Sequence, residues 1–202
     1  MATELVTPTT LAELSQALKL DYSADVKVFG LSYDSRDVQP GDLYLAIPGL
    51  QHHGIEFLDQ AISAGAVAVA SDTQGCKIAQ QHGLPTILLP NPRIDMAAIA
   101  AHLYGHPELK LRVIGVTGTN GKTTVTQMLR HLLSSVGNRV GVIGTLGTFI
   151  GDDQIPSART TPESPDLFKL LAQMVAASVD TVCMEVSSHA LELERVAGIT
   201  FD

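Results

Sequence analysis

One twelve-residue stretch restricts the fold of this chain more than any other. Residues 113–124 read Val-Ile-Gly-Val-Thr-Gly-Thr-Asn-Gly-Lys-Thr-Thr. The apolar, β-branched run 111–116 is typical of a buried parallel strand, and the turn after it is polar and rich in glycine. Apolar residues then recur at helical spacing up to Gly137, a natural helix stop: Val125, Met128, Leu129, Leu132, Leu133 and Val136. The pattern predicts a strand, a glycine loop and a helix in direct succession.

This succession is how a protein holds a triphosphate. Glycines let backbone N–H groups approach phosphates, and the helix N-terminus adds positive potential. Lys122 can reach the β- and γ-phosphates, and the Thr123 hydroxyl can ligate Mg²⁺. We therefore expect a nucleotide to contact the loop and the start of the helix, through Gly118, Thr119, Asn120, Gly121, Lys122, Thr123 and Thr124.

The loop departs from the usual phosphate-binding spacing. Val116 stands where the first glycine of the usual motif falls, and glycines occupy positions 115 and 118 instead. The alternative interpretation is an ordinary glycine turn with an exposed lysine. The strand before Gly-Lys-Thr and the helix after it favour the phosphate site.

Charge and composition exclude several classes of protein. Lys plus Arg total 13 against 21 Asp plus Glu, a net charge of −8, which argues against a broad nucleic-acid or anionic-membrane surface. The N-terminus lacks a signal pattern, and no apolar run approaches the ~18 residues of a membrane span. Cys76 and Cys183 stand alone, and Cys183, inside an apolar strand, is predicted to be core. We expect a soluble cytoplasmic protein.

The rest of the chain predicts an α/β fold. Thr10 and Glu13 have capping-box spacing. Strand and helix patterns then alternate over the first hundred residues. The expected strands are 26–33, 43–47, 66–70 and 85–89, and the later helices are 57–64, 76–82 and 91–104, the last with Asn91 as N-cap. The break at 105–107 predicts a domain boundary near residue 108, between domains 1–108 and 109–202.

The second half places polar clusters after its strands. Open α/β sheets bind ligands beyond the carboxyl ends of their strands. We expect three such clusters, at 117–124, 144–148 and 185–189. Glu185 directly follows an apolar strand, where a phosphate-loop fold keeps the acid that orients Mg²⁺ or its water. The alternative is an acidic residue in a turn. His189 has two open interpretations, a phosphate or metal neighbour and a capped core histidine.

Two clusters of the first half remain ambiguous from the residues alone. His52-His53 lacks partners at metal-ligand spacing, so a solvated loop pair is expected. Asp34-Ser35-Arg36 closes a strand with an acceptor, a hydroxyl and a bidentate cation. That set suits phosphate or sugar binding, and it suits a turn with a salt bridge equally well.

The motifs together resemble the Mur ligases of peptidoglycan synthesis. The resemblance is carried by the loop Gly-Val-Thr-Gly-Thr-Asn-Gly-Lys-Thr-Thr, then Ile-Gly-Thr-Leu-Gly-Thr, Thr-Thr-Pro-Glu and Met-Glu-Val-Ser-Ser-His-Ala-Leu. The early Asp-Ser-Arg…Pro-Gly-Asp-Leu-Tyr-Leu-Ala is similar to the family's UDP-binding domain. The motifs occur in the family's order from about Val28 onward. The displaced glycine matches the glycine spacing of the phosphate loop in this family.

The resemblance implies an ATP-dependent amide ligase. Such enzymes use ATP and Mg²⁺ to phosphorylate the C-terminal carboxylate of UDP-MurNAc-L-Ala-D-Glu, and the amine of a diamino acid then attacks the acyl phosphate. Family frequency favours meso-diaminopimelate over L-lysine. The implied catalytic residues are Lys122 and Glu185, the implied metal ligands are Thr123 and Glu185, and a monomer with no nucleic-acid partner and no membrane insertion is expected.

The family's substrate positions carry over to named residues. Those matching the UDP end are Tyr33, Ser35, Leu50, Gln51 and His52, and those matching the muramoyl-peptide are Thr160, Thr161, Ser187 and Arg195. Arg159 stands where an asparagine can occur and Leu193 where a glutamine can occur, so their roles do not carry over.

The resemblance also predicts a fragment, because family members continue past Asp202. We expect a UDP-binding α/β domain followed by the first part of a phosphate-loop ATPase domain with a mainly parallel sheet. The strand ending at Met184, and one starting at Ile199, would then lack later neighbours. The alternatives are folylpolyglutamate synthetase, the ligase adding D-Ala-D-Ala, and a non-catalytic nucleotide-binding module.

Overall fold

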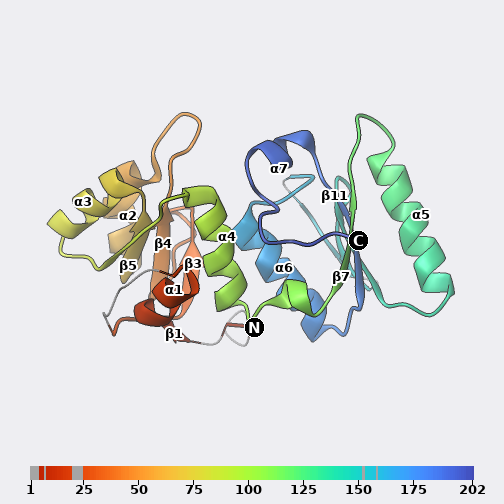
Figure 1. The fold of residues 1–202 in the computed structure, drawn as a ribbon, viewed down its shortest axis with the longest axis horizontal. Helices are drawn as coiled ribbons and strands as arrows, with labels where there is room; N and C mark the ends of the chain where they lie inside the picture. Colours follow the sequence, from red (N-terminus) through yellow and green to blue (C-terminus); the bar gives the residue numbers. More distant parts are fainter. Residues whose placement is uncertain (1–4, 7, 20–24, 152, 158) are drawn as a thin grey trace. The chain divides into compact units, whose positions relative to one another are not determined.

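The chain folds into two compact units. The structure is a computed structural model that describes residues 5–6, 8–19, 25–151, 153–157 and 159–202. The first unit is Met1–Gly105 and the second is His106–Asp202 (Figure 1). The division falls within the break at 105–107, from which the sequence predicts a domain boundary near residue 108. Each unit is described by itself.

The first unit is built on a four-stranded parallel sheet. Its strands are paired in chain order: β3 (Gly30–Ser32), β4 (Asp42–Ala46), β5 (Ala68–Ser71) and β6 (Thr86–Leu88). The helices of this unit are α1 (Leu11–Ala17), the 3-10 turn η1 (Gly54–Phe57), α2 (Leu58–Ala64), α3 (Thr73–Gln81) and α4 (Pro92–Leu103).

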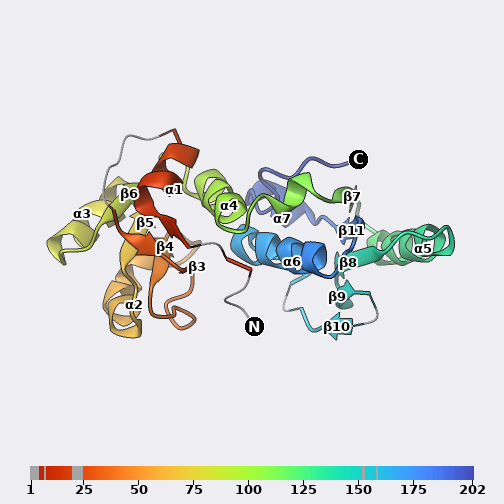
Figure 2. The ribbon, with the colours of Figure 1, turned by 90° about the horizontal axis from the view of Figure 1, so that it is seen from below.

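Both faces of this sheet are covered by helices, and successive side chains of β4 point alternately into the two hydrophobic cores. Leu43 and Leu45 pack with α1 and α4 on one face. Tyr44 and Ala46 pack with η1, α2 and α3 on the other. Figure 2 shows α1 and α4 on one side of the sheet and α2 on the opposite side. A sheet buried on both faces explains the near-continuous apolar strands.

One predicted strand, 26–33, is wrong as a single element. Its first part is β2 (Lys27–Val28), which pairs antiparallel with β1 (Thr9–Thr10) in a separate ribbon. Its second part is β3, which joins the main sheet. Phe29 lies between them and donates its N–H to Gly41 O at 3.0 Å. The chain therefore changes pairing partner within one apolar run, which the run itself does not reveal.

The helices of the first unit begin at N-cap residues, and only some of their cap hydrogen bonds agree with the sequence prediction. Thr10 and Glu13 form the expected capping box. The helix expected at 76–82 begins earlier, at Thr73, because the Asp72 carboxylate accepts the N–H of Gly75 at 2.9 Å. Asn91 is the N-cap of α4 and Pro92 its first residue, as expected, but the Asn91 side chain makes no cap hydrogen bond and its N–H is donated to the Asp95 carboxylate.

The second unit carries a five-stranded sheet in the order β10-β9-β8-β11-β7. The strands β7, β11 and β8 are parallel, and β9 and β10 extend the sheet as an antiparallel hairpin. Their bounds are β7 (Arg112–Val116), β8 (Val140–Gly144), β9 (Gly147–Ile150), β10 (Asp153–Ile155) and β11 (Thr181–Glu185). The strand ending near Met184 was expected to lack later neighbours and to lie at an edge. Instead, β11 is paired on both sides.

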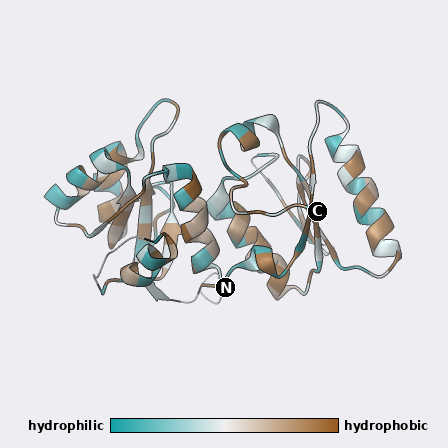
Figure 3. Cartoon of the chain, in the orientation of Figure 1, coloured by the Kyte–Doolittle hydropathy of each residue, from teal (hydrophilic) through white to brown (hydrophobic). Residues whose placement is uncertain are grey.

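Helices lie on both faces of this second sheet (Figures 1 and 2). On one face is α5 (Lys122–Ser135), and on the other are α6 (Ser164–Ala176) and α7 (Ser188–Glu192), while η2 (Pro107–Leu109) leads into β7. Figure 3 shows apolar segments along α5. Part of its predicted apolar face is exposed, namely Val125, Met128, Leu132 and Val136. Thr126 is the buried residue of this helix.

The α/β class predicted from sequence is confirmed, with the four-stranded sheet wholly parallel and the five-stranded sheet parallel across three adjacent strands. Cys183 is buried in β11, as expected. Among the described residues, no helix combines the length and the apolar character needed to cross a membrane.

We expect Asp72→Ala to lower the free energy of unfolding by about 1 kcal/mol, because it removes the α3 cap. Burial alone would raise the pKa of Asp72. Hydrogen bonds from Gly75 N–H and His53 outweigh that effect, and the net pKa lies below the ordinary 3.8. The stabilising contribution of the Asp72 carboxylate is therefore fully present above about pH 3.8. It is lost as the pH falls through the lower pKa of the folded state. Thermal unfolding from pH 7 to pH 3 measures it. The exposed Asp37→Ala is the control, and equal effects of the two would contradict the cap.

Candidate functional site

The predicted phosphate loop lies between β7 and α5 and has the required backbone shape. Gly118 and Gly121 have φ angles of +144° and +81°, which L side chains rarely adopt. Residues 117–121 are exposed. Gly121 precedes the first turn of α5, and no side chain caps that helix. The N–H groups of this turn are therefore available to an anion.

Lys122 lies over this loop. Its Nζ donates to the carbonyl of Gly118 at 2.7 Å, so the ammonium is held against the loop that is predicted to bind phosphate. The Thr126 hydroxyl donates to the Lys122 carbonyl at 2.8 Å, within the helix. The lysine carries positive charge at the mouth of the loop without taking part in the core.

Glu185 lies next to this loop because β11 pairs with β7. The last residue pair of the two strands joins Glu185 to Val116, immediately before the loop. The residue is 2% exposed, yet its carboxylate accepts three hydrogen bonds. The donors are the Thr123 hydroxyl at 3.0 Å, the Thr145 N–H at 2.9 Å and the Thr145 hydroxyl at 3.2 Å.

The donor set at Glu185 fits Mg²⁺. In the part of the chain that the structure describes, no basic side chain pairs with this buried carboxylate, and its hydrogen-bond donors are all neutral groups. An anion buried this way is costly unless a cation joins it. Mg²⁺ takes oxygen ligands and commonly uses one or two carboxylates plus phosphates and water. Thr123 and Glu185 supply such oxygens, although the described residues hold no cluster of three His, Cys, Asp or Glu.

Gly144 and Thr145, at the end of β8, belong to the predicted cluster 144–148, but neither was given a role from the sequence. A side chain at 144 would overlap the Glu185 carboxylate. Glycine is therefore required there for close approach. Thr145 contacts Glu185 and also lies 3.1 Å, oxygen to oxygen, from the Thr160 hydroxyl. Their position after a strand was visible in the sequence, but the neighbour they contact was not.

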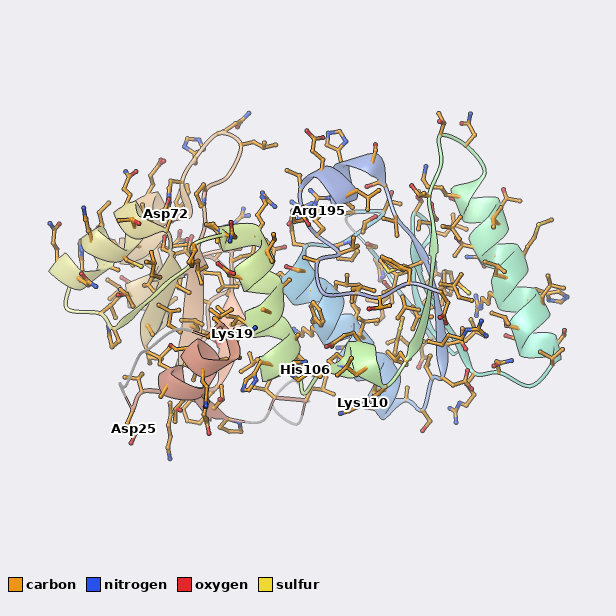
Figure 4. The ribbon with its side chains drawn as sticks, in the orientation of Figure 1. Lys19, Asp25, Asp72, His106, Lys110 and Arg195 are labelled. Atoms are coloured by element: carbon orange, nitrogen blue, oxygen red, sulfur yellow. The ribbon has the colours of Figure 1, made fainter. Side chains whose placement is uncertain are left out.

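Four predicted substrate residues come together around Thr161. The Thr161 hydroxyl donates to the Glu185 carbonyl at 2.8 Å and accepts the Ser187 N–H at 3.1 Å. Its carbonyl accepts from Arg195 Nη1 at 3.3 Å. Thr160 is linked to the same group through Thr145. Figure 4 shows Arg195 in the segment after α7.

The predicted UDP-contact residues follow adjacent parallel strands of the first unit. Tyr33 and Ser35 follow β3, and the loop 50–52 follows β4. Ser35 is buried and its hydroxyl donates to Gln60 Oε1 at 2.8 Å. Leu50, at the loop tip, is 85% exposed. His52 Nδ1 lies 3.1 Å from Glu56 Oε2.

The ambiguous clusters resolve differently. Arg36 and Asp34 form an ion pair at 2.5 Å, and the hydrogen bond from Arg36 lowers the pKa of the Asp34 carboxyl. The prediction of a solvated His52-His53 pair is wrong for His53. Its side chain is 16% exposed, accepts the Ile55 N–H and contacts Asp72 at 3.2 Å. A core role for His189 is also wrong, because that residue is exposed on α7.

Family models match both units. The "Mur ligase family, catalytic domain" model matches residues 27–106, and the "Mur ligase middle domain" model matches residues 116–202. The chain belongs to the Mur ligase family. The order of motifs that first suggested a Mur ligase is thus confirmed by models covering both halves.

Curated Mur ligases are similar in sequence to nearly the whole of this chain. A UDP-N-acetylmuramoyl-L-alanyl-D-glutamate–2,6-diaminopimelate ligase of Streptomyces avermitilis is 48% identical over 198 residues, covering 98% of this chain and 39% of that protein. A UDP-N-acetylmuramyl-tripeptide synthetase of Deinococcus radiodurans is 42% identical, covering 95% and 40%. The chain therefore spans about two fifths of the length of these relatives.

Solved structures of Mur ligases share the fold. A UDP-N-acetylmuramoyl-L-alanyl-D-glutamate–2,6-diaminopimelate ligase superposes with a TM-score of 0.80 at 28% identity, over 97% of this chain and 39% of the other. MurF of Acinetobacter baumannii superposes with a TM-score of 0.57 at 20% identity, over 91% and 37%. At that identity, the MurF likeness shows the fold alone.

We expect Thr145→Val to lower the free energy of unfolding by about 1–2 kcal/mol, because a buried carboxylate loses one donor while the side chain keeps its shape. Chemical denaturation of the whole chain measures the change. Thr200→Val is the matched control, since Thr200 is exposed and its hydroxyl makes no hydrogen bond within the described structure. Equal stability of the two variants would show that Thr145 does not support Glu185.

Proposed function

We propose that this chain is the substrate- and nucleotide-binding part of an ATP-dependent amide ligase. The ligase adds a diamino acid to UDP-MurNAc-L-Ala-D-Glu through an acyl phosphate. One observation carries the proposal: a buried glutamate, Glu185, contacts the Thr123 hydroxyl at the start of the helix that follows a phosphate loop. That arrangement suits phosphoryl transfer from a Mg²⁺-bound triphosphate.

In this proposal ATP binds residues 118–124. The backbone N–H groups at the start of α5 face its phosphates, and Lys122 neutralises the charge of the β- and γ-phosphates. Thr123 and Glu185 hold Mg²⁺, which when bound stabilises negative charge on the transferred group. Thr145 keeps the Glu185 carboxylate aimed at that position through its N–H and hydroxyl.

The substrate contacts divide between the two units. Tyr33, Ser35 and the loop 50–52 are proposed to hold the UDP end, and domain 1–108 is accordingly the UDP-binding domain. Thr160, Thr161, Ser187 and Arg195 are proposed to hold the muramoyl-peptide in domain 109–202. Support comes from the hydrogen bonds that join the last four residues to the strand carrying Glu185.

The identity of the diamino acid is supported by the names of the relatives. Several similar proteins are named as ligases for 2,6-diaminopimelate, and that diamino acid is proposed here. L-lysine is the alternative. The net charge of −8 supports small-molecule substrates rather than nucleic acid, and a monomeric cytoplasmic enzyme completes the proposal.

Two cheap assays separate the rival functions. Folylpolyglutamate synthetase has no UDP domain before its phosphate loop, so binding of UDP argues against it. A nucleotide-driven switch that reads guanine would prefer GTP, so filter binding of ATP against GTP tests that class. Our proposal requires UDP binding and a preference for ATP.

We expect Lys122→Ala to weaken Mg²⁺·ATP binding to the chain by at least about tenfold, the effect of losing one charge-assisted phosphate contact. The fold should survive, because within the described structure the Lys122 side chain bonds to the loop carbonyl of Gly118 and not to the core. Isothermal titration measures affinity, and circular dichroism checks the fold. Lys169→Ala, an exposed lysine on α6, is the matched control. Unchanged ATP affinity in a folded Lys122→Ala chain would remove the nucleotide site.

We expect UDP to bind without ATP, since its proposed contacts all lie in the first unit. Ser35→Ala should weaken that binding severalfold through loss of a hydroxyl partner and of the hydrogen bond to Gln60. Titration of UDP into the chain measures the affinity. Ser63→Ala, an exposed serine of α2, serves as control. No detectable binding of UDP by the wild-type chain at saturating concentration would reject the assignment.

A further inference from the structure

A carboxylate with no predicted role lies against Arg195, that of Glu163 in the Thr-Thr-Pro-Glu motif. Arg195 Nε lies 2.9 Å from Glu163 Oε1, and the side chains are only 14% and 9% exposed. The N–H of Nε finds no aligned hydrogen-bond acceptor, so this contact is an ion pair rather than a directed hydrogen bond. The guanidinium is thus anchored electrostatically and by the Nη1 contact to the Thr161 carbonyl.

Glu163 is fixed by its own place in the fold. It occupies the N-cap position of α6, and its side chain makes no cap hydrogen bond to that helix. Its carbonyl accepts the Leu167 N–H, which starts the helix. The carboxylate therefore reaches toward Arg195 instead of capping α6, although the helix dipole favours its charge at this end.

A second arginine shares the same oxygen. Arg159 Nη1 lies 3.5 Å from Glu163 Oε1, and its side chain is 48% exposed. Arg159, Glu163 and Arg195 together carry a net charge of +1. Such a group can hold an anionic substrate and still keep the buried arginine compensated, because an unpaired buried charge would be costly.

We propose that Glu163 is a positioning residue that orients Arg195 toward the carboxylate-bearing peptide end of the substrate. The proposal rests on the substrate role given to Arg195 above. The Glu163 carboxylate holds Nε by its charge, and the Thr161 carbonyl accepts a hydrogen bond from Nη1, so two groups constrain the position of the guanidinium. Its fork geometry then determines which carboxylate it can bind. Arg159 balances the charge from the solvent side.

The test compares three ligands on the whole chain: UDP, Mg²⁺·ATP, and UDP-MurNAc-L-Ala-D-Glu. We expect Glu163→Gln to bind the dipeptide substrate about tenfold more weakly, the loss expected when a charge-assisted contact is misaligned. UDP and ATP affinities should be unchanged. Glu192→Gln, which removes an equal charge on exposed α7, is the matched control and should bind all three like wild type.

Further variants separate this inference from the proposed function. Glu163→Asp keeps the charge but shortens the side chain and moves the carboxylate away from Arg195. This variant should fold and still bind the dipeptide substrate more weakly than wild type. Arg195→Ala should reduce the affinity for the dipeptide substrate further than either Glu163 variant does. Wild-type affinity in both Glu163 variants, with loss in Arg195→Ala, would overturn the positioning role alone. Wild-type affinity in Arg195→Ala would overturn the substrate role of Arg195 and the inference with it. Equal weakening of all three ligands would show a merely structural role and would overturn the inference.

Discussion

The second unit depends on burying one carboxylate at the end of its central strand. Glu185 is 2% exposed, and three surrounding segments meet its polar atoms. Thr123 comes from α5, Thr145 from the β8–β9 turn, and Thr161 bonds the Glu185 carbonyl. Because unsatisfied buried polar groups are costly, these segments are held together by the same residue that is proposed to bind the metal.

This dependence links the two proposed ligand sites of the second unit. Thr145 contacts Glu185 and Thr160, so a residue of the nucleotide side is one hydrogen bond from the muramoyl-peptide side. Thr161 then connects Glu185 to Ser187 and Arg195. A ligase must place a carboxylate of one substrate beside the γ-phosphate of another, and shared hydrogen bonds supply the fixed geometry that such a reaction needs.

The first unit shows a different use of polar groups. Asp72 caps α3 and contacts His53, while Glu56 accepts the His53 backbone N–H and contacts His52. These bonds anchor the carboxyl-terminal end of the loop whose exposed tip carries Leu50. A loop that carries binding residues on a rigid scaffold is a common arrangement. Here the scaffold is a parallel sheet packed on both faces.

The sequence by itself determined the α/β class, the phosphate loop with its helix, and the polar ends of the strands, because these depend on local periodicity and glycine spacing. It could not determine that β11 lies between β8 and β7, since strand order depends on long-range pairing. Only the tertiary structure therefore placed Thr145 and Gly144 against Glu185, and Glu163 against Arg195. The division of the run 26–33 between two sheets has the same reason. The residues of a strand do not by themselves specify which strand it pairs with.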